Sequence, residues 1–289
     1  MNSEVIIEIV KAVFKMFYGN KYDELIDKRM KNLVDIVFYN NHVTTNKLDT
    51  IEDYLKEYDI NKYNDEIIEK KIPISKYVLE TGQQGTMIYE NDDELKMIIY
   101  FPKSTINQYN YDCILIHELL HVIDEHIIYQ DNDVIISQGG FERMCIKGEK
   151  KLDRNFEFLN EIIHQRIAEE INEFMYDNNI LLINTREEKE KSINEYKKDR
   201  CPVVEIFYDK YKDILFSDKL NGNIEDFIKY VGEDYFIKFN EWINHFYNSY
   251  PTPTDRLENS NSEEYKKMIN DGIDIINNMN DTKNSQFSP

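Results

Sequence analysis

The chain has 289 residues and a formal net charge of −20, and 41% of its residues are hydrophobic. A chain of this length and composition can bury a substantial core, so we expect a globular protein. Its acidity and scattered basic residues argue against nucleic acid as a partner, because neutralising phosphates requires clustered Lys and Arg.

The apolar segments and the cysteines favour a cytoplasmic protein that does not enter a membrane. No apolar run approaches the roughly 18 residues that a membrane span needs. The first 20 residues lack the basic start of a signal peptide, and charged residues interrupt their apolar run. The cysteines form neither a C-x-x-C pair nor an even disulfide set, which suits a reducing compartment. They are Cys113, Cys145 and Cys201.

The first part of the chain is predicted to be helical. Apolar residues repeat at helical spacing from Val5 to Phe17, and Gly19 is placed to end that run. A second run follows from Tyr22 to about Phe38, and a third spans Leu48 to Tyr58. We therefore expect an N-terminal helical region over residues 1–72.

Two short β-rich segments come next. Residues 86–90 and 94–101 are separated by the polar residues 91–93, which is typical of an antiparallel hairpin with a polar turn. A helix should then begin near Asn110 or Asp112, either of which can cap it, and carry the run CILIHELLHVIDEHII.

The rest of the chain is predicted to be helical up to a polar tail. Residues 73–250 should form one domain and residues 251–289 a flexible end, because Pro, Ser, Asn, Asp and Thr dominate there. The fold class is thus α+β and predominantly helical, with a small antiparallel sheet beside the central helix. Further helices are expected over 155–176, 184–199, 202–216 and 224–248.

His117, Glu118 and His121 spell H-E-x-x-H inside the apolar run of the central helix. Residues four apart project from one face of a helix, so both imidazoles can reach one tetrahedral ion at about 2.0–2.1 Å. The carboxylate between them can point at a water on the open coordination position. Burying these groups among Ile and Leu would be costly without a strong partner. The pattern therefore predicts one Zn²⁺ ion.

A catalytic zinc needs a third protein ligand, and the preferred candidate is Glu161. It lies on the next substantial helix, in the string LNEIIHQRIA, whose apolar residues allow that helix to pack against the first. A shifted alignment could instead recruit Glu157 or Glu169. His164 could support a ligand, face the substrate, or be a partly exposed helix residue.

H-E-x-x-H followed by N-E-x-x on a second helix resembles the gluzincin branch of the zincin superfamily, which includes the thermolysin-like peptidases. The resemblance covers about residues 86–176 and implies that Glu161 is the third zinc ligand, with Asn160 as its neighbouring motif residue. The stretch HELLHVID, then GF and LNE, is also similar to small uncharacterised zincin-like proteins of Gram-positive bacteria. A zincin-like fold is what this resemblance implies.

One position departs from the family pattern. Thermolysin-like enzymes carry an Asp four residues after the ligand Glu, where it accepts a hydrogen bond from a zinc-bound imidazole, and this chain has Gln165 there. An amide oxygen can orient an imidazole but lacks the carboxylate's charge, so we expect a weaker metal site. Asp124, which follows the motif together with His126, could also orient a ligand imidazole.

The resemblance implies a peptidase mechanism. Zinc lowers the pKa of its bound water toward about 7, and Glu118 takes the proton as that water attacks a polarised carbonyl. The same carboxyl then delivers the proton to the leaving amine. Gluzincins usually add a Tyr or His that stabilises the oxyanion. Tyr196, Tyr208 and His245 are available, of which Tyr196 is preferred, and an ordinary structural Tyr is the open alternative.

In zincins the strand before the active-site helix forms one wall of the cleft, and MIIYF stands in that position. An extended peptide could add alongside it through main-chain hydrogen bonds, or MIIYF could simply be a buried strand. Cys113, one turn before His117, is interpreted as a small core residue. Substrate contacts are predicted at Met97, Ile98, Ile99 and Tyr100.

These observations favour a zinc metallopeptidase that acts on a peptide or protein substrate. A second hypothesis is a catalytically silent zincin-like protein that keeps the metal for structure or sensing and acts by binding a partner. A third, an acidic helical adaptor without metal, applies only if the motif is accidental. Glu118 separates the first two, because a purely structural zinc site does not require it.

Overall fold

The structure, a computed structural model, describes residues 3–31, 33–39, 97–102, 109–124, 126–131, 134–147, 150–222 and 224–279. The chain divides into two compact units. The first combines Met1–Ile123 with Ala168–Ile193, and the second combines Asp124–Ile167 with Asn194–Pro289. The predicted domain boundaries at 72 and 250 stay a prediction.

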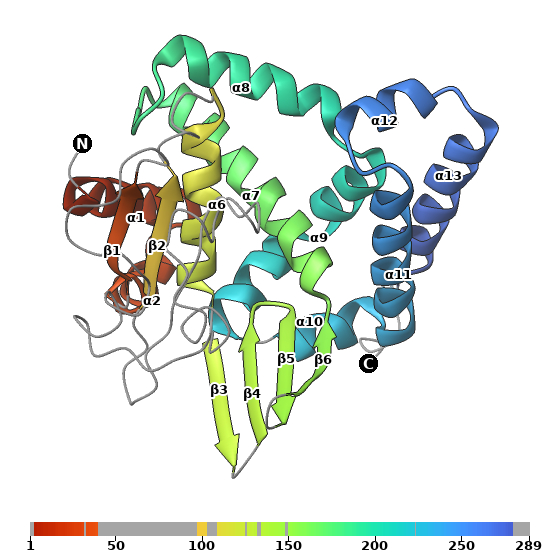
Figure 1. The fold of residues 1–289 in the computed structure, drawn as a ribbon, viewed down its shortest axis with the longest axis horizontal. Helices are drawn as coiled ribbons and strands as arrows, with labels where there is room; N and C mark the ends of the chain where they lie inside the picture. The colour runs from red at the N-terminus through yellow and green to blue at the C-terminus, as the bar shows by residue number, and fades with distance from the viewer. Residues whose placement is uncertain are drawn as a thin grey trace, which may run out of the picture. The chain divides into compact units, whose positions relative to one another are not determined.

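The first unit contains the N-terminal helices and the helix that carries the H-E-x-x-H motif (Figure 1). Apolar side chains spaced three and four residues apart place one face of α1 in the core, as the sequence pattern predicts. The helical parts of this unit are α1 (Ser3–Tyr18), the short η1 (Asn20–Tyr22), α2 (Asp23–Met30), α6 (Tyr111–Ile123), the last part of α7 (Glu157–Asp177) and the first part of α8 (Arg186–Asp199).

The start of α6 is held by a buried carboxylate. Both oxygens of Asp112 accept hydrogen bonds, from the backbone N–H groups of residues 182–184 and from Lys189 Nζ at 2.8 Å. Asn184 Oδ1 in turn accepts from the backbone N–H of Asp112 at 2.7 Å. Lys189 also donates to Asn172 Oδ1. Because Asp112 and Lys189 are fully buried, this pair holds α6 in one position against the segment that precedes α8.

The end of α6 is held by a buried cation. Arg29 of α2 donates from Nη1 to the carbonyl oxygen of Ile123, the last residue of α6. A cation suits this position, because the last carbonyls of a helix have no intrahelical donors and carry partial negative charge. The apolar face of α6 between these two contacts is buried in the core, including Leu115, Ile116, Leu119 and Leu120.

The predicted fold class is wrong about the antiparallel sheet that it places before the central helix. The small antiparallel sheet expected over 86–101 is not seen, and the chain is mostly helical. Instead β2 (Met97–Pro102) pairs in parallel with β1 (Leu33–Tyr39), with Ile36 opposite Ile99. The other arm of the expected hairpin lies outside the described residues.

The second predicted helix is too long, because its last part forms a strand. It was expected to run from Tyr22 to about Phe38, but α2 ends at Met30 and β1 follows. The segment LVDIVFY is rich in β-branched and aromatic residues, which favour a strand when a partner strand is available. The parallel partner lies far along the chain, so local periodicity could not indicate it. The helix expected over Leu48–Tyr58 lies outside the described residues.

The central helix is also shorter than predicted, since it ends at Ile123 and the residues after it form strands. These strands pair antiparallel in the order β3-β4-β5-β6 and are drawn side by side in Figure 1. The tight connection between β4 and β5 is Gly140–Phe141, within the glycine-containing loop seen in the sequence. The strands are β3 (His126–Asp131), β4 (Val134–Gly139), β5 (Glu142–Lys147) and β6 (Lys150–Asn155).

The second unit has an aromatic helical core. Phe207 stacks on Phe239 with ring centroids 4.4 Å apart, and Phe227 packs against both Phe207 and Phe236. The helix predicted over 224–248 is split at Gly232, whose φ of 92° is incompatible with a helix. The helices are α9 (Pro202–Asn221), α10 (Ile224–Val231), α11 (Glu233–Ser249), α12 (Pro253–Asn259) and α13 (Glu263–Asn278).

Much of the segment expected to be a flexible tail is helical. Thr252 and Asp255 form a reciprocal capping box at the start of α12, and the Ser262 side chain caps α13. α13 buries Met268, Gly272 and Ile276 along one face, and its Met268 carbonyl accepts a hydrogen bond from Trp242 Nε1 at 2.8 Å. Polar composition predicts flexibility, but three buried positions at helical spacing are enough to hold α13 on α11. Residues 280–289 lie outside the described residues.

No helix in the described part of the chain is long and apolar enough to cross a membrane.

Replacing Lys189 by Met should lower the free energy of unfolding by about 3–5 kcal/mol, because Asp112 would stay buried without its counter-ion. Urea denaturation followed by circular dichroism measures this loss. Lys198→Met on the exposed face of α8 is the matched control and should change stability by no more than about 0.5 kcal/mol. Equal stabilities for the two variants would contradict the buried pair.

Replacing Gly272 by Ala should lower the free energy of unfolding by about 1–3 kcal/mol through overpacking. A Cβ at this position would lie 2.6 Å from Cε2 of Trp242 and 2.8 Å from Cγ1 of Val203. Trp242 is the single Trp of the chain, so its fluorescence reports the packing directly. Asn270→Ala, on the exposed face of α13, is the control and should leave both stability and fluorescence near their wild-type values.

Candidate metal centre

His117 and His121 lie on the same face of α6, one helical turn apart. Their ring centroids are 5.3 Å apart and the ring planes are inclined at 65°, so the two imidazoles are neighbours without stacking. Both side chains are half-buried, although the helix around them is almost completely covered. Two histidines with partial access to solvent can exchange a metal ion with it.

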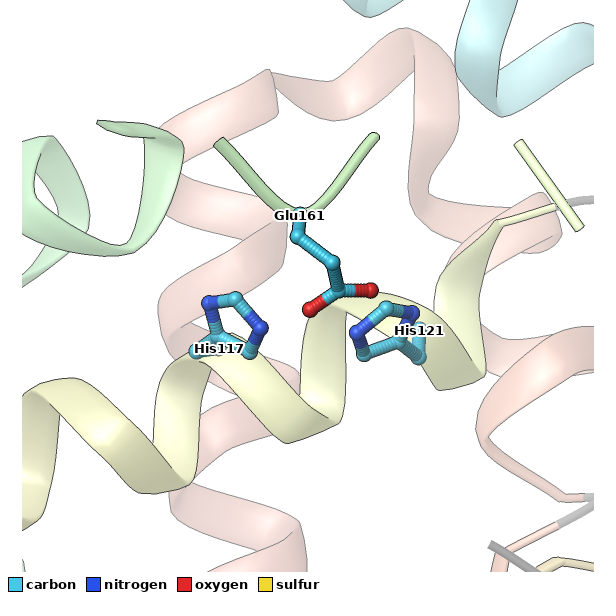
Figure 2. A group of neighbouring side chains, drawn as sticks. All are labelled: His117, His121 and Glu161. Atoms are coloured by element: carbon cyan, nitrogen blue, oxygen red, sulfur yellow. The ribbon is translucent and has the colours of Figure 1, made fainter. Parts of the chain in front are cut away.

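Glu161 of α7 lies with these two histidines. Figure 2 shows its carboxylate directed toward both imidazoles. One ligand atom from each of His117, His121 and Glu161 can be chosen so that all three lie within 4.8 Å of one another. Among the described residues, these three form the group of His, Cys, Asp or Glu side chains whose ligand atoms lie close enough to hold a metal ion. Glu161 is half-buried, like the histidines.

The donor set fits a zinc ion. Two imidazole nitrogens and one carboxylate oxygen form a recurrent catalytic zinc set, which leaves a fourth position open. Bonds of about 2.0–2.1 Å in tetrahedral geometry separate neighbouring ligand atoms by roughly 3.4 Å. The ligand atoms of His117, His121 and Glu161 lie within 4.8 Å of one another, a wider limit than this separation.

Glu118 lies on α6 next to His117 and is half-buried. It does not belong to the group of three ligand-type residues. A carboxylate one position after a ligand histidine projects from a neighbouring part of the helix surface, since successive residues on a helix are separated by about a quarter turn.

Asp124 lies in a buried polar cluster, defined as Asp124, Asn160, His164 and Lys219. Its Oδ2 atom accepts hydrogen bonds from His164 Nε2 at 2.8 Å and from Lys219 Nζ at 2.9 Å. Lys219 Nζ also donates to Asn160 Oδ1 at 2.9 Å. All four side chains are almost completely buried. Asp124 therefore contacts the imidazole of His164, and its predicted contact with a ligand imidazole stays a prediction.

The cluster differs from the sequence analysis in two further residues. Of the roles left open for His164, that of a partly exposed helix residue is excluded, because its exposed fraction is 0%. Lys219 was not identified as a functional candidate, because a single Lys in a helix is normally solvated. The signal that could have indicated it is its place at the end of α9 between the apolar Phe216 and Leu220, where a Lys side chain faces the core.

The polar cluster determines the charge state of Asp124. Burial opposes the ionisation of this carboxyl, but the positive charge of Lys219 and the contact with His164 outweigh it, so its pKa is held well below 3.8. An ionised Asp124 is an acceptor only, so the Nε2 atom of His164 carries the proton in their hydrogen bond. Asp124 and Lys219 thus form a buried ion pair with His164 attached to it.

The remaining predicted residues fall outside the group of three. Gln165 is half-buried one turn after Glu161, and Glu169 is buried on the same helix. The Tyr196 ring lies against the Arg200 guanidinium at 5.3 Å, Tyr208 is buried beneath Arg166, and His245 is exposed. The side chains of Glu157, His126 and the substrate residues Met97, Ile98, Ile99 and Tyr100 lie outside the described ones.

No family model, curated protein or solved structure matches this chain.

Asp124→Asn should reduce the acid sensitivity of stability. Because the folded-state pKa of Asp124 is below the value of 3.8 that applies to an exposed Asp, ionised Asp124 stabilises the fold above pH 3.8 and loses this effect progressively as the pH falls further. The stability difference between wild type and Asp124→Asn should therefore be largest above pH 4 and shrink toward pH 2. Urea titrations across this range measure it, and a constant difference would contradict an ion pair.

Proposed function

We propose that this protein is a zinc-dependent metallopeptidase, in which His117, His121 and Glu161 hold the ion. The observation that carries the proposal is the grouping of these three side chains, two from the H-E-x-x-H helix and one from α7. The three residues come from two different helices, α6 and α7, and each can offer one ligand atom to the same ion. Their identity and their partial exposure are those of a catalytic site rather than a closed structural one.

Bound zinc at such a site supplies Lewis-acid activation of a substrate carbonyl and of the attacking water. The protein supplies the proton transfers. Glu118, on the same helix and outside the ligand set, is the candidate base that accepts a proton from the attacking water. The protonated carboxyl can then donate to the leaving amine, so one side chain serves both halves of peptide-bond hydrolysis.

The site is built on a support that suits catalysis. α6 is held at its start by Asp112 and at its end by Arg29, so the two histidines lie on a helix whose position is fixed from both ends. Ligands held in place before the ion binds need less ordering when it does. The substrate is proposed to be an extended peptide. We also propose a reducing, cytoplasmic setting, which the cysteine pattern of the sequence favours.

A second candidate function is metal-dependent partner binding without catalysis. Gln165 favours it, because this amide occupies the position at which the resembling peptidases carry an Asp. The ligands of such a protein would be the same, but Glu118 would have no function. Hydrolysis therefore separates the two functions, and zinc binding does not.

Purified protein should contain about one zinc ion per chain. Glu161→Ala should lower zinc affinity by at least tenfold, because two histidines alone form an incomplete set. Elemental analysis gives the stoichiometry, and competition with a chromophoric chelator gives the affinity. Glu169→Ala on the same helix is the matched control and should bind zinc as wild type does. A wild-type chain that folds normally and binds no zinc would overturn the proposed function.

Glu118→Gln should keep zinc and lose peptide hydrolysis by a factor of about 10²–10⁴, the usual contribution of a general base. Cleavage of a peptide library, read by mass spectrometry, measures activity in the wild type and the variant. Unchanged cleavage by Glu118→Gln would exclude its role as the base. Zinc binding without any cleavage by the wild type would favour the partner-binding function instead.

A further inference from the structure

Glu161 is flanked on α7 by two members of the buried polar cluster. Asn160 precedes it directly, and His164 follows it within one helical turn. Asn160 and His164 are four residues apart, so they lie on one face of the helix, and Glu161 projects from an adjacent face. The two flanking residues are therefore well placed to determine the direction in which the Glu161 carboxylate points.

Both flanking residues are connected to the same ion pair. His164 donates to Oδ2 of Asp124, and Asn160 accepts from Lys219 Nζ, which also contacts Oδ2 of Asp124. Rotating or sliding the start of α7 would break buried, charge-assisted hydrogen bonds, which are much more costly to lose than exposed ones. The first turns of α7 are thus held in one rotational setting.

Asp124 also connects this cluster to the helix of the two histidines. It lies three residues after His121 and directly follows Ile123, whose carbonyl oxygen accepts a hydrogen bond from Arg29. One carboxylate is therefore attached covalently to the end of α6 and by hydrogen bonds to α7. Asp124 thus joins the sequence that follows the H-E-x-x-H motif to the two residues that flank Glu161.

The turn between β4 and β5 closes the cluster. Gly140 has a φ of 56°, and a Cβ there would lie 2.6 Å from both Asn160 Oδ1 and Lys219 Nζ. The Phe141 N–H donates to Asn160 Oδ1 at 3.1 Å, and its ring lies 5.1 Å from Lys219 Nζ. The backbone of this turn is thus in close contact with the polar atoms of the cluster. The low polarity of such a buried site strengthens the electrostatic contacts among those atoms.

We propose that Asp124, Asn160, His164 and Lys219 are positioning residues that hold the Glu161 carboxylate within ligand distance of His117 and His121, and so increase the affinity for zinc. This inference rests on the proposed zinc site. The inference goes beyond that site by assigning a role to Lys219, which contacts Asp124, Asn160 and the Phe141 ring.

The first experiment compares zinc affinity with overall stability. Lys219→Met should lower zinc affinity about tenfold or more, the effect typical of residues that orient metal ligands. Met268→Ala on α13 is the matched control, because it removes buried packing in the second unit away from the cluster. It should lose stability while binding zinc with wild-type affinity. Zinc affinity is measured by chelator competition at a temperature at which each variant is folded.

A milder pair of variants covers the case in which Lys219→Met does not fold. His164→Gln keeps a donor that can reach Asp124, and His164→Leu does not. His164→Leu should weaken zinc binding and alter the visible spectrum of the cobalt-substituted protein, while His164→Gln should restore both. If His164→Leu binds zinc like the wild type although its stability is reduced, the cluster is structural only and the proposal is wrong.

A double-mutant cycle tests whether the cluster acts through Glu161. In the Glu161→Ala background the ligand that the cluster positions is gone, so His164→Leu should cause no further loss of zinc affinity. An additional loss equal to that in the wild-type background would overturn the positioning role. Absence of zinc in the wild type itself would instead identify a failure of the proposed function, so the two failures are distinguished.

Discussion

A single carboxylate, that of Asp124, accepts hydrogen bonds from a buried lysine and a buried histidine, and the proposed positioning of Glu161 depends on this arrangement. Removing Asp124 and Lys219 from water costs several kcal/mol for each ion. Their mutual contact, the hydrogen bonds to His164 and Asn160, and the enclosing Gly140 turn offset that cost. The arrangement is tolerated because the Lys219 ammonium and Oδ2 of Asp124 are in direct contact and each has a further hydrogen-bond partner.

The buried cations follow a pattern along α6. Among the described residues four cationic side chains of Arg or Lys are buried, and three of them contact Asp112, Ile123 or Asp124. These three positions are the start of α6, its last residue and the residue after it. In a chain with a net charge of −20, positive side chains are the scarcer type. Their concentration around one helix suggests that its position, rather than general stability, is what they serve.

The sequence allowed the helical parts and the three ligand residues to be predicted because both signals are local. Helical periodicity indicated α1, α6, α7, α8 and α9, and the H-E-x-x-H and N-E-x-x motifs singled out the three residues that the structure groups. The parallel pairing of Leu33–Tyr39 with Met97–Pro102 could not be predicted from local sequence. Taken by itself, the first segment resembles the end of a helix and the second resembles one arm of a hairpin. The buried state of Lys219 depends on contacts 59 and 95 residues away, and its only local signal is its place between Phe216 and Leu220.

The contacts that hold α6 also impose an order on folding. Asp112 meets its backbone donors about 70 residues later in the chain, and Asp124 meets Lys219 95 residues later. Such non-local contacts form late, because the intervening chain must first lose much of its freedom. During synthesis the motif helix can form soon after it leaves the ribosome, but its final setting waits until α9 has emerged. Binding of the proposed zinc ion by the nascent chain would therefore wait until α9 has been synthesised.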